Sequence, residues 1–270
     1  MQIFERELFL RIALVVLIVF TISTNAFAVI IERQSMRDMA PLISQGTLVV
    51  FDIDNTLIQQ AQTLGSDQWF SYVLKQYTDK GMTKEAALAK TSGFWQQINY
   101  ETGVLPVEPQ TPAFLRRLQD AGLIVVGLTS RNAMFVDITE RQLHDVQIDF
   151  SRSPISGRSD MAIDTVRYYH GVLMTTGQNK GESLLKFLNR FQLHPQKVVF
   201  VDDILGNVQK MEDALTKANI PVVNVRYGAL DARVRAFNPK IPLVEWGIFS
   251  KYHRLISDDA ALRIINSENQ

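Results

Sequence analysis

Short apolar runs recur along the chain, and stretches with helical periodicity separate each run from the next. The runs with the clearest pattern cover residues 48–51, 123–128, 197–201 and 221–226. A run that is apolar on both faces is typical of a strand buried inside a parallel sheet. Strands that alternate with helices in this way predict an α/β fold built on a doubly wound, Rossmann-like parallel sheet.

Residues 59–107 separate the first predicted strand from the second, and they are helical in pattern and rich in aromatic side chains. Ser66 is suited to cap a first helix, Thr83 begins a second helix, and a third follows. This pattern predicts a small α-helical cap at 59–107, inserted into a core formed by residues 29–58 and 108–270. We expect the aromatic side chains to fill the cap or its contact with the core, and a substrate pocket is the alternative.

The first 28 residues have the organisation of a secretory signal peptide. Arg11 precedes the apolar stretch 12–20, and an A-x-A pattern ends at Ala28, which predicts cleavage after that residue. We therefore expect an exported protein, periplasmic or secreted, with no membrane attachment once the signal is removed. Because apolar residues resume at Val29, an uncleaved membrane anchor is the alternative, although the uninterrupted run is short for a membrane span.

Composition narrows the range of partners and chemistries. Lys+Arg and Asp+Glu number 28 each, so the formal net charge is zero, and no basic run appears. Nucleic-acid binding is therefore not expected. The absence of cysteine excludes disulfides and thiol chemistry, and the four histidines lack zinc-ligand spacing. The sequence does not indicate an oligomeric state.

Polar residues follow three of the predicted strands at the point where each strand ends, and a lysine begins a later helix. These residues are Asp52 and Asp54, then Thr129, then Lys180 on the helix, and finally Asp202 and Asp203. In an open α/β sheet, ligands bind outside the carboxyl ends of the strands. Each group has an ordinary interpretation as a helix cap, a turn residue or a solvated lysine. Together they predict one polar site at one edge of the sheet.

The pair Asp52 and Asp54 carries the most chemical information. Residues two apart in an extended chain point to the same side, so both carboxylates can face one site. Two neighbouring acids favour a bound cation or a raised pKa. An aspartate can also attack phosphorus to form an aspartyl-phosphate. For the pair taken alone, capping of a turn is the alternative.

The order and spacing of these groups resemble the haloacid dehalogenase superfamily of phosphohydrolases over residues 46–226. The residues that match its four motifs, in order, are Asp52-Ile53-Asp54-Asn55-Thr56, Thr129, Lys180 and Asp202-Asp203. The predicted helical insertion after the first motif is similar to a cap of that superfamily. The exported context resembles its secreted acid phosphatases.

The resemblance implies a magnesium-dependent phosphomonoester hydrolase that acts on a small phosphorylated metabolite. Asp52 would be the nucleophile and Asp54 the general acid and base, while Thr129 and Lys180 would complete the catalytic set. Because a halide needs no proton to leave, the presence of Asp54 favours phosphoester cleavage over dehalogenation.

The resemblance also implies ligands for Mg²⁺ and for the substrate phosphate. The metal residues would be Asp52, Asp54 through its backbone carbonyl, Asp202 and Asp203, the last in or beside the ligand shell. The phosphate would be contacted by Asn55, Ser130 and Arg131, although Arg131 could instead pair with a carboxylate. A phosphotransferase or phosphomutase on the same scaffold and a non-catalytic phosphate-ligand binding protein stay open as alternatives.

Overall fold

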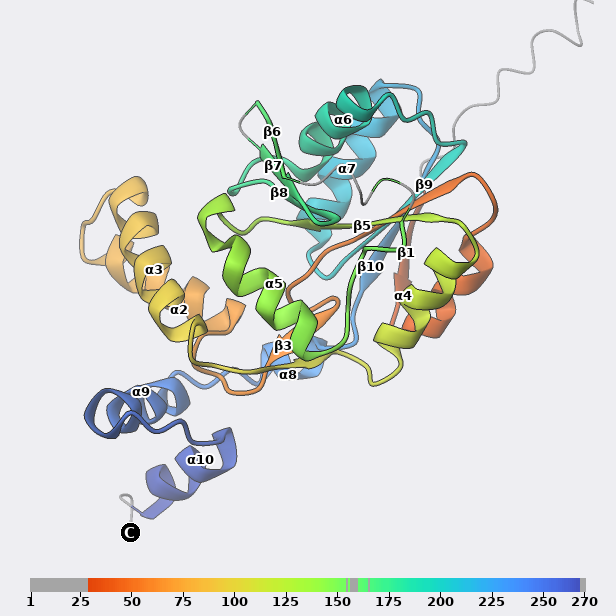
Figure 1. Cartoon of the computed structure of the whole chain (residues 1–270). Helices are drawn as coiled ribbons and strands as arrows, with labels where there is room; N and C mark the ends of the chain where they lie inside the picture. Colours follow the sequence, from red (N-terminus) through yellow and green to blue (C-terminus); the bar gives the residue numbers. More distant parts are fainter. Residues whose placement is uncertain (1–28, 154, 156–159, 165, 268–270) are drawn as a thin grey trace, which may run out of the picture.

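One eight-stranded sheet organises the fold (Figure 1). The computed structural model describes residues 29–153, 155, 160–164 and 166–267, so the predicted signal peptide at 1–28 lies outside the described residues. The strands have the spatial order β1-β10-β9-β2-β5-β8-β7-β6, and those from β1 to β8 pair in parallel while the last two pairings are antiparallel. The predicted α/β fold with a mostly parallel central sheet is confirmed.

The strands of this sheet have the bounds β1 Val29–Arg33, β2 Thr47–Phe51, β5 Ile124–Thr129, β6 Met161–Ile163, β7 Val166–Tyr169, β8 Val172–Met174, β9 Lys197–Asp202 and β10 Val222–Tyr227. The helices that cover it are η1 Met36–Leu42, α4 Thr111–Asp120, η2 Ala133–Phe135, α5 Val136–Asp145, α6 Lys180–Phe191, α7 Leu205–Lys217 and the short α8 Asp231–Arg235.

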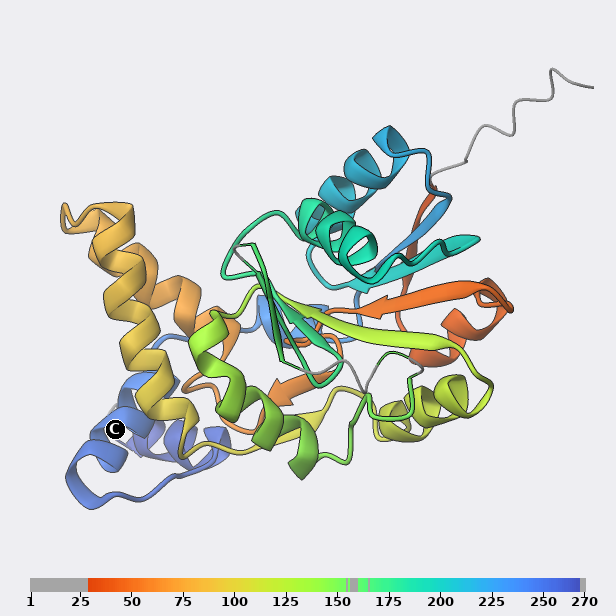
Figure 2. The ribbon, with the colours of Figure 1, turned by 45° about the horizontal axis from the view of Figure 1, so that its top comes forward.

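The central strand β2 is buried on both faces, which is why it is apolar at every position after Thr47. Val49 and Phe51 belong to the core layer that includes residues of η1, α4 and α5. Leu48 and Val50 point to the opposite layer, which includes residues of α6 and α7. The helices therefore cover both faces of the sheet, as Figure 2 shows, and leave the carboxyl ends of the strands free for a site.

The structure adds strands at both edges of the sheet. β1 pairs in parallel with β10, so the apolar residues after position 28 form an edge strand of the core sheet. At the other edge, β8, β7 and β6 form an antiparallel meander. These short strands lack a long apolar run, and their pairing depends on neighbours that the local pattern does not reveal.

A two-stranded antiparallel ribbon of β3 Ile58–Gln60 and β4 Val104–Pro106 leads into and out of a helical hairpin, α2 Asp67–Asp79 and α3 Lys84–Asn99. Ser66 and Thr83 cap these helices, since their hydroxyls accept hydrogen bonds from Trp69 N at 3.2 Å and Ala86 N at 3.3 Å. The second and third helices predicted in this segment are one continuous helix, α3. The hairpin projects from the sheet domain in Figures 1 and 2.

The C-terminal helices α9 Lys240–Tyr252 and α10 Asp258–Ser267 lie against this hairpin rather than on the sheet. The ring of Trp246 meets that of Phe94 edge-on, with centroids 4.6 Å apart. Leu64 N donates to Glu245 Oε2 at 2.7 Å, and Thr63 bonds to the carboxylate of Asp258. The helical module therefore includes C-terminal residues that the sequence-based division assigned to the core. Within the described ranges, no helix combines the length and apolarity needed to span a membrane.

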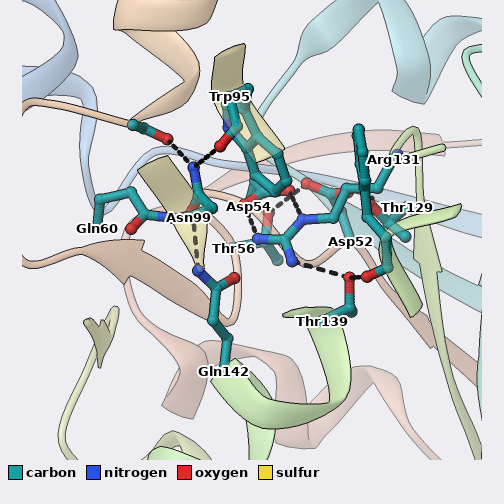
Figure 3. A network of polar contacts seen from close by, with 12 residues as sticks. Asp52, Asp54, Thr56, Gln60, Trp95, Asn99, Thr129, Arg131, Thr139 and Gln142 are labelled. Atoms are coloured by element: carbon teal, nitrogen blue, oxygen red, sulfur yellow. Dashed lines mark hydrogen bonds and ion pairs between the residues drawn. The ribbon is translucent and has the colours of Figure 1, made fainter. Parts of the chain in front are cut away.

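The buried side chain of Asn99 fixes the base of the hairpin to the core (Figure 3). Its amide nitrogen donates to the carbonyl oxygens of Gly65 and Trp95, both at 3.1 Å. Its oxygen accepts from Gln60 at 2.8 Å and from Gln142 of α5 at 2.9 Å. Because each of these groups is withdrawn from water, breaking the network leaves several polar atoms unsatisfied.

The replacement Glu245→Gln tests the pH dependence that one buried acid confers. Burial and the nearby Asp258 carboxyl raise the pKa of Glu245 from 4.5 to about 8. Between pH 4.5 and about pH 8, Glu245 holds a proton in the folded protein but not in the unfolded chain. The contribution of this proton to the stability of the folded state is therefore complete below the lower pKa and is lost as the pH rises through the higher one. The wild type should therefore lose more thermal stability than Glu245→Gln between about pH 6 and about pH 9.

Calorimetric unfolding of both proteins at each pH measures this difference. Glu101→Gln, which changes an exposed glutamate, is the matched control and should follow the wild type. Equal pH dependence in Glu245→Gln and the wild type would show that Glu245 does not titrate in this way.

Candidate active site

The carboxyl ends of three adjacent parallel strands place the predicted polar residues together. Asp52 follows β2, Asp202 ends β9 and Thr129 ends β5, and β2 lies between the other two strands. Lys180, the first residue of α6, donates from Nζ to Asp202 Oδ2 at 2.6 Å and to Asp52 Oδ1. All four residues are buried. The predicted clustering of these side chains at one edge of the sheet is therefore what the structure contains.

The start of α6 is built so that Lys180 reaches the acids. Asn179 caps the helix, accepting from Gly181 N at 2.9 Å. A Cβ on Gly181 would lie 2.6 Å from Ala214 Cβ and 2.7 Å from the carbonyl oxygen of Lys210. Glycine at this position therefore permits the close approach of α6 to α7, and with it the depth at which Lys180 sits.

A tight loop after β2 directs the residues of the first motif. Asn55 has φ 58°, a left-handed conformation that asparagine tolerates better than most residues. Its backbone N–H donates to Ile58 O at 2.8 Å. Thr56 Oγ1 donates to Asp52 Oδ2 at 3.3 Å. Both oxygens of Asp52 are thus hydrogen-bonded, one to Thr56 and one to Lys180.

Three carboxylates, Asp52, Asp202 and Asp203, each offer an oxygen within 4.8 Å of the others. Asp202 is fixed by Ile204 N at 2.8 Å and by the amide of Asn207 at 3.1 and 3.2 Å. Asp203 Oδ1 is buried with no hydrogen-bond partner among the described residues.

Burial of the three-acid cluster shifts its proton affinities. Burial raises the pKa of Asp52 well above its usual range, against the attraction of Lys180, and the charges of Asp202 and Asp203 raise it further. Burial, followed by the charge of Asp202, raises the pKa of Asp203 to about 7. Burial alone would lower the pKa of Lys180, but Asp202 and Asp52 hold it above its ordinary value.

The cluster therefore has three acids against one buried cation, and one of its oxygens lacks a partner. Carboxylate oxygens are the ligands that Mg²⁺ prefers in proteins. A divalent cation would supply both the missing charge and a partner for Asp203 Oδ1, so the residues present fit a magnesium ion. Asp52, Asp202 and Asp203 are the side chains that could hold it.

Asp54 faces a different partner, the guanidinium of Arg131 (Figure 3). Arg131 Nε and Nη2 donate to the two Asp54 oxygens at 2.8 and 2.7 Å, a bidentate ion pair. Arg131 Nη1 donates to Thr139 Oγ1 at 2.9 Å, and the guanidinium lies 5.0 Å from the centroid of the Trp95 ring on α3. The carboxylate of Asp54 is therefore outside the three-acid cluster, and any metal contact of this residue would use its backbone.

The other predicted residues have distinct positions. Thr129 Oγ1 accepts from Arg131 N at 3.1 Å. Ser130 is exposed and lines the cleft above the site. The side chain of Asn55 lies beside Asp203, whose pKa it lowers.

A cleft of about 710 Å³ opens over these residues, between the strand ends and the α2–α3 hairpin. Its hairpin side includes Asp67, Phe70, Glu85 and Leu88. Burial in the cleft, followed by the charges of Asp54 and Asp203, raises the pKa of Asp67 to about 8. The sequence analysis did not identify Asp67, because an acidic residue after a serine cap is an ordinary helix start.

Residues 31–262 match the protein family described as "Protein of unknown function (DUF2608)". The chain belongs to this family. Similar proteins include "Putative outer membrane protein" of Chlamydia trachomatis serovar D, 24% identical over 79% of this chain and 80% of the relative. "Uncharacterized protein RP296" of Rickettsia prowazekii is 21% identical over 87% of this chain and 89% of the relative.

Solved structures similar to this DUF2608 protein are hydrolases of the haloacid dehalogenase class. One, a HAD-superfamily hydrolase of subfamily IA from Geobacter sulfurreducens, is 13% identical, with a TM-score of 0.40 over 70% of this chain and 98% of that chain. A haloacid dehalogenase-like hydrolase from Streptococcus pneumoniae is 11% identical, with a TM-score of 0.42 over 71% of this chain and 99% of that chain.

Magnesium should raise the unfolding temperature of this DUF2608 protein, because a cation that binds the acids of the folded state stabilises that state. At free Mg²⁺ about 100-fold above its Kd, the added stability is about 2.7 kcal/mol. Asp203→Asn should lose most of the shift, since it removes a charged ligand from the cluster.

Calorimetry with Mg²⁺ and with a chelator measures the shift. Asp213→Asn, which changes an exposed acid on α7, is the matched control and should keep it. A full shift in Asp203→Asn would show that the cation binds elsewhere.

Proposed function

We propose that the protein is a magnesium-dependent phosphomonoester hydrolase of the haloacid dehalogenase type, which works through an aspartyl-phosphate. The observation that carries this proposal is the position of Asp52, held by Lys180 and Thr56 at a strand end beside Asp202 and Asp203. An aspartate fixed at the floor of a cleft, with a lysine ammonium against it, is suited to attack a phosphorus atom.

In the first step, a carboxylate oxygen of Asp52 forms a bond to phosphorus while the bond from phosphorus to the ester oxygen breaks. Asp54 gives a proton to that oxygen, so the leaving group departs as a neutral alcohol. In the second step, Asp54 takes a proton from water as the water attacks phosphorus, which releases inorganic phosphate and regenerates Asp52. General acid–base assistance of this kind typically contributes about 10²- to 10⁴-fold.

Charge compensation at the cleft floor is the second requirement of this reaction. Lys180 is buried against Asp52, so its ammonium offsets negative charge where it develops on the phosphoryl oxygens. Thr129, whose hydroxyl lies at the end of β5, is positioned to donate to a phosphoryl oxygen. When bound by Asp52, Asp202 and Asp203, magnesium supplies Lewis-acid stabilisation of the phosphoryl group and reduces its repulsion from Asp52.

Arg131 orients the proposed acid. Its guanidinium donates a hydrogen bond to each oxygen of Asp54. One of these two hydrogen bonds must open before Asp54 can protonate a leaving group. The approaching phosphate dianion competes for the guanidinium, which couples substrate binding to release of the acid. Arg131 is therefore a positioning residue in this scheme.

We also propose that the protein works outside the cytoplasm. The signal-peptide pattern that ends at Ala28 supports export. Relatives from Chlamydia carry the name "Putative outer membrane protein", which fits an envelope location.

Asp52→Asn should reduce phosphate release to background, because an amide is not a nucleophile toward phosphorus at this site. The measurement is release of inorganic phosphate from 4-nitrophenyl phosphate and from a panel of phosphorylated metabolites, with magnesium and with chelator. Asp213→Asn is the control and should match the wild type. Turnover that persists in Asp52→Asn would rule out the nucleophile, while transfer to an added alcohol in preference to water would identify a phosphotransferase.

Asp54→Asn should lower the rate in a way that depends on the leaving group. Loss of the acid matters most for alkyl phosphates, whose alkoxides leave poorly without a proton, and least for 4-nitrophenyl phosphate. We expect a loss of about 10²- to 10⁴-fold with an alkyl ester and a smaller loss in the phosphorylation of Asp52 by the nitrophenyl ester. Single-turnover kinetics separates that step from hydrolysis of the intermediate. An equal loss for both esters in that step would show that Asp54 is not the general acid.

A further inference from the structure

The wall of the cleft opposite the catalytic acids has a composition that the proposed reaction does not explain. Its hairpin side presents two carboxylates, Asp67 of α2 and Glu85 of α3, together with the apolar side chains Phe70 and Leu88. Met134 adds a further apolar group from the core side. A wall that combines apolar surface with a few charged groups is typical of a site that binds an organic ligand.

Positive charge in the cleft is already committed. The cationic side chains among its described lining residues are Arg131 and Lys180. Arg131 is bound by both oxygens of Asp54, and Lys180 by Asp52 and Asp202. No cation in the described lining is left over for a second anionic group, such as a carboxylate on the leaving group of a phosphomonoester.

Asp67 is the acid of this wall that interacts electrostatically with the reacting groups, because the charges of Asp54 and Asp203 raise its pKa. Within the described chain its carboxyl makes no hydrogen bond or ion pair. It is not needed as the helix cap, since Ser66 already accepts from Trp69 N. Burial and the charges of Asp54 and Asp203 raise the pKa of Asp67 against the attraction of Arg131 and Lys180, and a ligand ammonium beside Asp67 would stabilise its ionised carboxylate.

We propose that the leaving group of the natural substrate carries an amine as well as an apolar portion, and that Asp67, at the base of the hairpin, selects it. The inference rests on the proposed phosphomonoesterase function and specifies its substrate class as cationic aminoalkyl or aminoaryl phosphomonoesters. The phosphate lies against Asp52 and Lys180, while the ammonium lies against Asp67, one of the two carboxylates of the hairpin. Substrates with an anionic leaving group are disfavoured, because the same carboxylates repel them.

Three aryl phosphates of similar size test this selection: 4-(aminomethyl)phenyl phosphate, 4-(hydroxymethyl)phenyl phosphate and 4-carboxyphenyl phosphate. Their leaving groups are cationic, neutral and anionic. The readout is the ratio of kcat/KM for the charged esters to that for the neutral ester, compared between proteins so that differences in intrinsic reactivity cancel. In the wild type we expect the order cationic, neutral, anionic, with steps on the order of tenfold.

Asp67→Asn should reduce the cationic-to-neutral ratio by about tenfold, and Glu85→Gln should reduce it much less because Glu85 is exposed and lies at the other end of the hairpin from Asp67. The matched control is Asp79→Asn, at the other end of α2, where the acid pairs with Lys75 on the surface. It removes the same charge from the same helix and should leave the ratio unchanged.

Two failures are distinguishable in this experiment. Hydrolysis of all three esters without charge discrimination, or with a ratio that Asp67→Asn does not change, would overturn the amine inference and leave the phosphatase standing. Metal-dependent hydrolysis of none of the three, together with none in the metabolite panel, would overturn the proposed function and the inference with it.

Discussion

The buried contact of Lys180 with Asp52 and Asp202 is the interaction on which the rest of the site depends. It joins α6 to the carboxyl ends of β2 and β9 at the buried floor of the cleft. Removing one partner of a buried ion pair typically costs about 3–5 kcal/mol, because the other charge stays buried without compensation. The packing of α6 against α7, which Gly181 permits, is thereby linked to the position of the proposed nucleophile, Asp52.

Arg131 connects the site at the end of the sheet to the helical hairpin. It contacts Asp54 in the first loop, Thr139 on α5 and the ring of Trp95 on α3. The same stretch of α3 is anchored by Asn99, which bonds to both the ribbon and α5. The orientation of the proposed acid and the position of the hairpin are therefore not independent, and a shift of one changes the contacts of the other.

The floor and the hairpin wall of the cleft differ in the ligand groups that their charges favour. Its floor concentrates acids around a lysine, an arrangement that favours a divalent cation and a phosphoryl group. Its hairpin wall adds negative charge and apolar surface without any free cation among the described lining residues. In a family described only as of unknown function, this division is the physical basis on which both the reaction and the substrate class are proposed.

The apolar pattern by itself determined the central strands, because a strand buried on both faces must be apolar along its length. The polar residues at the ends of those strands then determined the site, because parallel strands joined by helices end at one edge. Tertiary structure decided the edge strands, the placement of α9 and α10, the partner of Arg131 and the exposure of Asp67 to the cleft. These features depend on contacts between distant residues, as between Arg131 and Asp54, 77 positions apart, and between Leu64 and Glu245, 181 apart. A local pattern reports whether a side chain is buried, but only the folded chain decides which side chain it meets.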